Sequence, residues 1–281
     1  MLVFSNAYEL QAELPTSFSS LGLVPTMGAL HQGHISLVER AIKENSHVIV
    51  SIYVNPTQFN RVEDLEQYPR NIDKDLETLA PYSNKIMVYI PTNEDLYPEG
   101  IKVKTYAFGT LTQYFEGAYR PGHFDGVATV IESLFTRINP TKAYFGEKDF
   151  QQVLVIKALV KLLSLNIKII SCPIIRAKDG LALSSRNALL SKEHLEKACV
   201  IYNILQKITE NRGHWNVQQM RAYFFEKIEA LPGFKIDYFA VADPKTLTPE
   251  EELIPSKNYR IFIAVYAGTI RLIDTIELRR K

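Results

Sequence analysis

The chain has 281 residues, of which 46% are hydrophobic and 22% are charged, a composition typical of a globular protein with enough apolar residues for two domains. Thirty-two basic and thirty-one acidic residues leave a formal net charge of +1. This balance excludes the strong positive field on which non-specific nucleic-acid binding depends, so we expect no nucleic-acid partner, although a local basic pocket is compatible with it.

The sequence also predicts a cytoplasmic protein without a membrane role. Its first fourteen residues include Glu9 and Glu13 and do not have the basic start and apolar stretch of a signal peptide. The longest apolar runs, such as residues 48–54, are the length of a strand and too short to cross a bilayer. Cys172 and Cys199 match neither a disulfide framework nor a zinc spacing, and we expect two reduced thiols.

The first two-thirds of the chain alternates short β-branched runs with amphipathic stretches, a pattern that predicts βαβ units and a parallel sheet. We expect strands at residues 21–26, 47–54, 85–91, 142–147 and 167–175. Helices are expected at about 35–42, 73–80, 126–138 and 150–164. Asp73 and Asp75 begin one of these helices, where the helix dipole favours carboxylates, and a metal role for them is remote.

The pattern of hydrophobic and charged residues changes after about residue 184. Two charged amphipathic helices are expected at roughly 191–211 and 215–230, followed by a strand at 235–244 and a hairpin at 260–274. The predicted fold is therefore α/β. It has a doubly wound, Rossmann-like parallel-sheet domain over residues 1–184 and a smaller C-terminal α+β domain over residues 185–281.

Ligands of open parallel sheets bind beyond the carboxyl ends of the strands, so the segment that follows the first expected strand is a candidate site. It reads PTMGALHQGH, in which Gly28 and Gly33 permit a tight backbone and His31 and His34 lie three residues apart at the start of a helix. Unpaired N–H groups and the helix dipole make such a start a phosphate site. The segment is not a Walker loop, because His34 and Ile35 stand where lysine and serine or threonine are required. A plain βα turn with two incidental histidines is the alternative.

Polar residues also follow the second and fourth expected strands. Asn55 and Gln58 offer amides that bind a carboxylate, hydroxyl or amine without adding charge, although a surface turn uses the same residue types. The segment FGEKDFQQ, residues 145–152, combines a lysine suited to a phosphate with carboxylates suited to a ribose or a hydrated metal, and glutamines suited to a polar substrate. A charged, solvated loop is the alternative there.

Two further loops contain candidate residues. Ser184, Ser185 and Arg186 place two hydroxyls and a guanidinium side by side, which suits a loop that closes over phosphates and stabilises a pyrophosphate leaving group. The alternative is a pair of helix-capping serines beside a surface arginine. Arg120 and His123 lie in a Gly- and Pro-containing loop that we expect to line a site.

Five motifs occur in one order along residues 21–190: PTMGALHQGH, VNPTQF, YRPGHFDGVATV, FGEKDFQQ and RAKDGLALSSRN. Together they closely resemble the pantothenate synthetase family of the HxGH nucleotidyltransferase superfamily. The resemblance implies a ligase that uses ATP and Mg²⁺ to join pantoate to β-alanine. Pantoate attacks the α-phosphate of ATP, pyrophosphate leaves, and β-alanine then attacks the pantoyl adenylate to give pantothenate and AMP. The resemblance also implies a homodimer.

The same resemblance implies roles for individual residues. His34, His31, Lys148 and Arg186 are the expected catalytic residues, and no metal ligand is identified. Pantoate is expected at Gln58 and Gln152, with Asn55, Arg120 and His123 lining the pocket. The expected ATP-binding residues are Met27, Gly28, Ala29, Leu30, His31, Gln32, Gly33, His34, Gly146, Glu147, Lys148, Asp149, Ile175, Leu183, Ser184, Ser185 and Arg186.

Two other functions are compatible with parts of the pattern. An adenylyltransferase of the same superfamily would move AMP onto a phosphate ester, but its acceptor would favour cations where the neutral amides of Gln58 and Gln152 stand. A non-catalytic nucleotide-binding module would be expected to have lost His34, Lys148 or Arg186, and all three are present.

Overall fold

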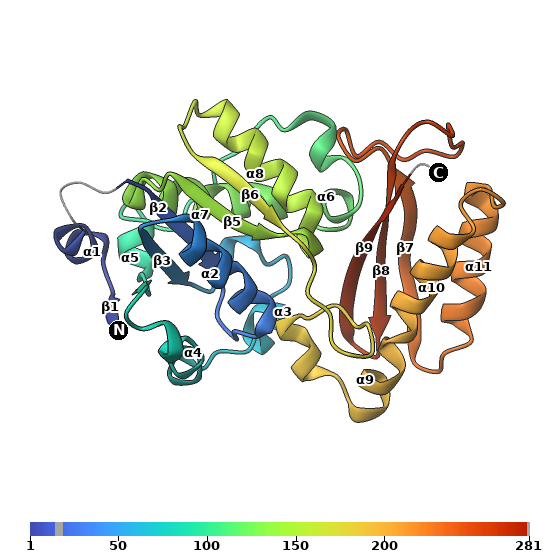
Figure 1. The fold of residues 1–281 in the computed structure, drawn as a ribbon, viewed down its shortest axis with the longest axis horizontal. Coiled ribbons are helices and arrows are strands. Elements are labelled where there is room, and N and C mark those ends of the chain that lie inside the picture. The colour runs from blue at the N-terminus through green and yellow to red at the C-terminus, as the bar shows by residue number, and fades with distance from the viewer. Residues whose placement is uncertain (15–18, 280–281) are drawn as a thin grey trace.

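The computed structural model describes residues 1–14 and 19–279 and contains a six-stranded parallel sheet (Figure 1). The spatial order of the strands is β1-β4-β3-β2-β5-β6. The strands are β1 (Leu2–Phe4), β2 (Leu21–Thr26), β3 (His47–Ile52), β4 (Met87–Tyr89), β5 (Lys142–Gly146) and β6 (Lys168–Cys172). All five expected strands are present, and β1 is an additional three-residue edge strand that the sequence pattern did not reveal.

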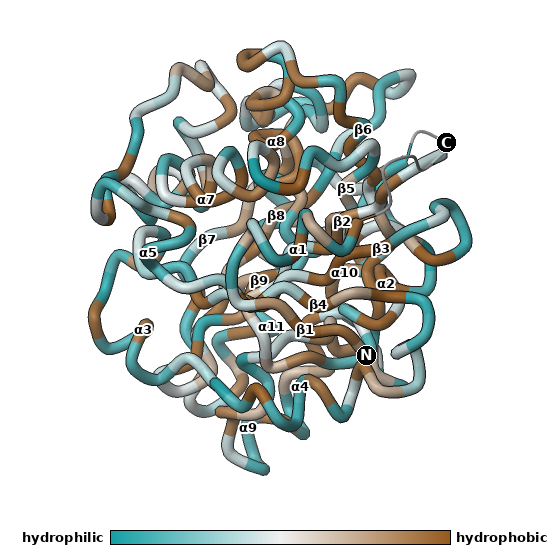
Figure 2. The backbone as a smooth tube through the Cα atoms, turned by 90° about the vertical axis from the view of Figure 1, so that its left-hand side faces the viewer, coloured by the Kyte–Doolittle hydropathy of each residue, from teal (hydrophilic) through white to brown (hydrophobic). Residues whose placement is uncertain are grey.

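Helices cover both faces of this sheet because its strand residues alternate between two apolar cores. Leu23 of β2 faces a core completed by α7 (His123–Ile138) and α8 (Phe150–Leu162), whereas the next residue, Val24, faces a core completed by α2 (Gln32–Glu44). The remaining helices of this part are α1 (Ala7–Glu13), α3 (Val62–Gln67), α4 (Ile72–Leu79), α5 (Asn93–Leu96) and α6 (Glu116–Tyr119). Figure 2 shows hydrophobic stretches along the central strands.

The C-terminal part is a three-stranded antiparallel sheet packed against helices, as predicted (Figure 1). Its strands are β7 (Phe234–Ala242), β8 (Tyr259–Ala267) and β9 (Ile270–Leu278). Its helices are α9 (Lys192–Ala198), α10 (Val200–Glu210) and α11 (Val217–Glu229). The expected helix at 191–211 is interrupted at Cys199, which separates α9 from α10. None of the described helices is long and apolar enough to cross a membrane.

The strand order makes the loops that follow β2 and β5 leave the sheet in opposite directions. The chain continues from β2 to β3 on one side, whereas β5 lies on the other side of β2. Beyond the carboxyl ends of β2 and β5, the connecting segments therefore diverge to opposite sides and leave a crevice. The motifs that follow β2, β3, β5 and β6 all reach this edge of the sheet.

Candidate active site

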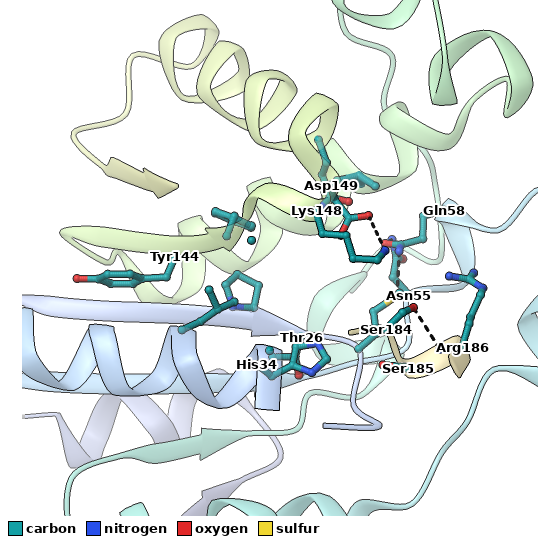
Figure 3. Close-up of a pocket in the computed structure, with 18 of the residues that line it drawn as sticks. Thr26, His34, Asn55, Gln58, Tyr144, Lys148, Asp149, Ser184, Ser185 and Arg186 are labelled. Atoms are coloured by element: carbon teal, nitrogen blue, oxygen red, sulfur yellow. Dashed lines mark hydrogen bonds and ion pairs between the residues drawn. The ribbon is translucent and has the colours of Figure 1, made fainter. Parts of the chain in front are cut away.

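A cavity of about 230 Å³ lies at this edge, and most of the predicted site residues line it (Figure 3). The lining residues that were predicted are Met27, His31, Gly33, His34, Asn55, Gln58, Arg120, His123, Gly146, Lys148, Asp149, Gln152, Ile175, Leu183, Ser184, Ser185 and Arg186. Five others lie outside the lining: Gly28, Ala29, Leu30, Gln32 and Glu147. The motifs thus converge, but not every residue within a motif faces the cavity.

His31 and His34 cap the N-terminus of α2 and lie against each other, with ring centroids 4.1 Å apart. The backbone N–H of Gly33 donates to Nδ1 of His31 at 3.1 Å, and the backbone N–H of His31 donates to Nδ1 of His34 at 3.3 Å. Because each Nδ1 accepts a hydrogen bond, the proton of each neutral imidazole is assigned to Nε2. Both rings are therefore oriented as Nε2–H donors.

Burial keeps these two imidazoles neutral. Burial and the nearby charge of Lys148 lower the pKa of His31 to about 4, and burial together with His31 and Lys148 lowers the pKa of His34 to about 3. Groups with such low pKa values are weak proton acceptors at neutral pH. They are suited to donating hydrogen bonds to a negatively charged ligand rather than to accepting a proton from one.

Asp75 of α4 binds the backbone of the turn before His31. The sequence predicted no role for Asp75 in the site apart from a remote one in metal binding. Its buried carboxylate accepts hydrogen bonds from the backbone N–H groups of Ala29 at 3.0 Å and Leu30 at 2.7 Å. Gly28 has φ +76°, and a Cβ there would lie 2.7 Å from Oδ2 of Asp75, so the turn requires glycine. The N–H groups of Ala29 and Leu30 therefore face Asp75 rather than the cavity.

The amide of Gln58 is fixed by neighbouring side chains on the opposite wall. Asn55 is 1% exposed and donates to Oε1 of Gln58 at 3.1 Å, while its own Oδ1 accepts from Tyr97 at 2.8 Å. Nδ1–H of His123 and Nη2–H of Arg120 both donate to the main-chain carbonyl oxygen of Gln58, at 2.7 and 3.2 Å. Burial and the charge of Arg120 lower the pKa of His123 to about 4. Asn55 therefore orients the Gln58 side chain, and its own polar atoms are bonded within the protein.

The close approach of α7 to this wall depends on a glycine. A Cβ on Gly126 would lie 2.2 Å from the carbonyl oxygen of Thr57, so a larger residue cannot occupy that position without moving the backbone. The same helix supplies an apolar wall at helical spacing: Val127, Val130, Ile131 and Leu134. The sequence shows this stripe, but its spacing is that of any core-facing helix, so it did not reveal a cavity wall.

The segment after β5 contributes both charges and amides to the cavity. Nζ of Lys148 lies 4.0 Å from Oδ1 of Asp149, and both residues line the cavity together with Gln152. Glu147 points elsewhere, because it pairs with Arg260 at 3.3 Å and accepts from the Ser171 hydroxyl at 3.0 Å.

The serine–arginine loop lies across the cavity from these residues (Figure 3). The Ser185 hydroxyl donates to the carbonyl of Ala29 at 3.0 Å, which seats the loop on the turn after β2. Arg186 forms a forked ion pair with Asp64 of α3, with Nη2 3.1 Å from Oδ1 and 3.0 Å from Oδ2. The cavity thus combines cationic groups and hydrogen-bond donors with neutral amides. Such an arrangement suits a polyphosphate beside a small polar substrate.

The chain is similar to known proteins of one family over nearly its whole length. The family model described as Pantoate-beta-alanine ligase matches residues 3–277. The chain belongs to the pantoate–β-alanine ligase family. A pantothenate synthetase from Christiangramia forsetii is 46% identical over 259 residues, which are 92% of each chain.

Solved structures of the family have the same fold. The crystal structure of pantothenate synthetase from Thermus thermophilus has a TM-score of 0.91 and 42% identity, with 99% of both chains covered. A pantoate–β-alanine ligase from Francisella tularensis, described as complexed with beta-gamma ATP and beta-alanine, has a TM-score of 0.82 and 37% identity, covering 98% of this chain and 97% of that one. The predicted family and fold are confirmed.

Proposed function

We infer that this protein joins pantoate to β-alanine at the expense of ATP, which is cleaved to AMP and pyrophosphate. The observation that carries this conclusion is one cavity lined by neutral imidazole donors, by Lys148 and Arg186, and by the amides of Gln58 and Gln152, in a member of the pantoate–β-alanine ligase family. Pantoate attacks the α-phosphorus of ATP through its carboxylate, and pyrophosphate leaves. The amine of β-alanine then attacks the carbonyl carbon of the pantoyl adenylate and releases AMP.

The residues proposed for ATP are those around the start of α2, the cavity-lining residues Gly146, Lys148 and Asp149, and the loop Leu183–Arg186. His31 and His34 would donate through Nε2–H to the phosphates, because their Nδ1 atoms already accept backbone hydrogen bonds. Lys148 and Arg186 would balance the charge that grows on the departing pyrophosphate. In this proposal His31, His34, Lys148 and Arg186 are the catalytic residues, and they act by positioning and charge stabilisation.

The residues proposed for pantoate are Gln58 and Gln152. Arg120 and His123 hold Gln58 in place through their hydrogen bonds to its main-chain carbonyl oxygen. The neutral amides of Gln58 and Gln152 suit a small hydroxy acid better than a phosphate ester, and this favours the ligase over an adenylyltransferase, although the Arg120 guanidinium lines the same wall.

We propose that Mg²⁺ arrives as part of the Mg–ATP substrate. No group of three His, Cys, Asp or Glu side chains within residues 1–14 and 19–279 is arranged to hold a metal ion. Mg²⁺ commonly keeps its waters and binds through substrate phosphates and one or two carboxylates, and Asp149 on the cavity wall offers one such carboxylate.

A homodimer remains a proposal from the family resemblance, and a cytoplasmic location remains a proposal from the sequence. The domain boundary between residues 184 and 185 is also a proposal. The apolar cores change slightly earlier: the two cores of the parallel sheet extend as far as Cys172, and the core of the C-terminal sheet begins at Leu181.

The activity is tested by following AMP and pyrophosphate release from purified protein with Mg–ATP and pantoate, with β-alanine added or withheld. We expect steady turnover only when all three substrates are present. AMP release that does not depend on pantoate and β-alanine would overturn the proposal that the protein is a ligase. Formation of a dinucleotide in place of AMP would identify an adenylyltransferase instead.

A further inference from the structure

The helix α3 contacts the loop that carries Arg186 through a charged side chain rather than through a buried apolar face. None of its residues is buried, its N-cap Arg61 makes no side-chain capping hydrogen bond, and Val62 at its start is 66% exposed. Burial of an apolar face normally holds such a short helix in place. Asp64 instead joins α3 to the loop after β6 through the forked pair with Arg186.

The loop that carries Arg186 is anchored at a second point. Ser185 is hydrogen-bonded to the carbonyl of Ala29, and the Arg186 guanidinium lies 5.6 Å from the ring centre of Tyr68, which follows α3. The cavity-lining loop therefore joins the turn after β2 to the helix after β3. The Asp64–Arg186 pair forms the end of this bridge nearer to solvent, with side chains 37% and 25% exposed.

We propose that Asp64 is a positioning residue for Arg186, and that their ion pair closes the cavity over the activated acyl intermediate. This inference rests on the proposed function, because an acyl adenylate must be shielded from water. If the pair opens, water attacks the carbonyl carbon of the adenylate, AMP leaves, and pantoate is regenerated. The net reaction is then hydrolysis of ATP to AMP and pyrophosphate without formation of an amide.

The test measures pantoate-dependent AMP release without β-alanine, as a fraction of AMP release with β-alanine. Asp64→Asn removes the charge but keeps the shape, and we expect this fraction to rise about 1.5- to fivefold, the range for loss of a partly exposed ion pair. Asp64→Glu restores the charge and should bring the fraction back toward that of the wild type. Glu63→Gln is the matched control, because it makes the same charge change on the same helix at a side chain 66% exposed.

A second measurement does not depend on activity. Hydrogen exchange of the backbone at residues 184–189 should be faster in Asp64→Asn than in the wild type and unchanged in Glu63→Gln. Equal leakage and equal exchange in the wild type and Asp64→Asn would overturn the proposal, as would the same increase in Glu63→Gln. A wild-type protein that forms no AMP in a pantoate-dependent way would instead overturn the proposed function, and the exchange experiment would still decide whether Asp64 holds the loop.

Discussion

His34 both caps the N-terminus of α2 and is proposed to donate a hydrogen bond to the substrate. Its Nδ1 accepts from the backbone of His31, which leaves Nε2–H as the donor available to a ligand in the cavity. A side chain fixed in this way needs no rearrangement when charge develops on the substrate, which is the condition for effective electrostatic catalysis.

We predict that His34→Ala raises the barrier by about 2 to 4 kcal/mol, the loss of one preorganised donor, measured as a fall in kcat/KM for ATP. His34→Gln should retain more activity than His34→Ala, because the amide Nε2–H replaces the imidazole donor. His214→Ala is the control, since His214 is exposed and lies outside the cavity lining. Wild-type turnover in His34→Ala would remove His34 from the mechanism.

The lowered pKa of His123 predicts that the free energy of unfolding depends on pH. Burial lowers its pKa in the folded state to about 4, whereas the ordinary value of 6.5 applies when the chain is unfolded. As the pH falls below 6.5 the unfolded chain binds the proton first, so stability that is present above pH 6.5 is lost as the pH approaches 4.

We expect His123→Asn, whose amide replaces Nδ1–H, to lose roughly 2 kcal/mol less free energy of unfolding between about pH 7 and pH 5 than the wild type. Urea denaturation at the two pH values measures this difference. His214→Ala should lose as much stability as the wild type. An identical loss in His123→Asn would show that His123 is not held neutral.

At the scale of elements, α4 supports the turn after β2 through Asp75. Burial raises the pKa of Asp75 more than its hydrogen bonds from Leu30 and Ala29 lower it. These hydrogen bonds nevertheless satisfy two backbone donors that would otherwise be unpaired. The element that shapes the proposed phosphate site is therefore a helix whose contacting residue lies 45 residues beyond Leu30 along the chain.

Asp75→Ala should lower the free energy of unfolding by about 1 to 3 kcal/mol, the cost of unpaired buried donors, and raise KM for ATP. Asp73→Ala is the control, because Asp73 lies on the exposed side of the same helix. Steady-state kinetics and urea denaturation measure the two effects. Equal KM values for ATP in the two variants would show that Asp75 does not set the shape of the phosphate site.

At the scale of the whole molecule, a buried ion pair joins the C-terminal sheet to the α6 segment beside the cavity. Arg271 of β9 donates to both carboxylate oxygens of Glu116 at 2.8 Å, and Glu116 also lies 3.7 Å from Arg120. Burial alone would raise the pKa of Glu116, but Arg271 and Arg120 hold it below its usual value. The C-terminal part thus contacts the residues that support Gln58.

Arg271→Ala leaves the buried Glu116 carboxylate without its main partner, and we expect a loss of about 3 kcal/mol in the free energy of unfolding. Arg221→Ala, which removes an exposed pair with Glu251, should cost at most about 1 kcal/mol. A double-mutant cycle with Glu116→Gln measures the coupling. Strictly additive losses would contradict a direct interaction.

The sequence by itself determined the order of the main elements and the identity of the cavity motifs. Hydrophobic period distinguishes strands from helices, and the carboxyl ends of parallel strands meet at one edge, so the residues after β2, β3, β5 and β6 could be predicted to converge. The three-residue strand β1 was missed because so short a segment carries no measurable period.

Only the tertiary structure decided which residue within each motif faces the cavity and which distant side chain supports it. Glu147 turns away because Arg260, 113 residues further on, pairs with it. Asp75 and Asp64 contact the site across separations of 45 and 122 residues. The partner of a carboxylate depends on which segments the fold brings within about 4 Å, and local sequence patterns do not contain that distance.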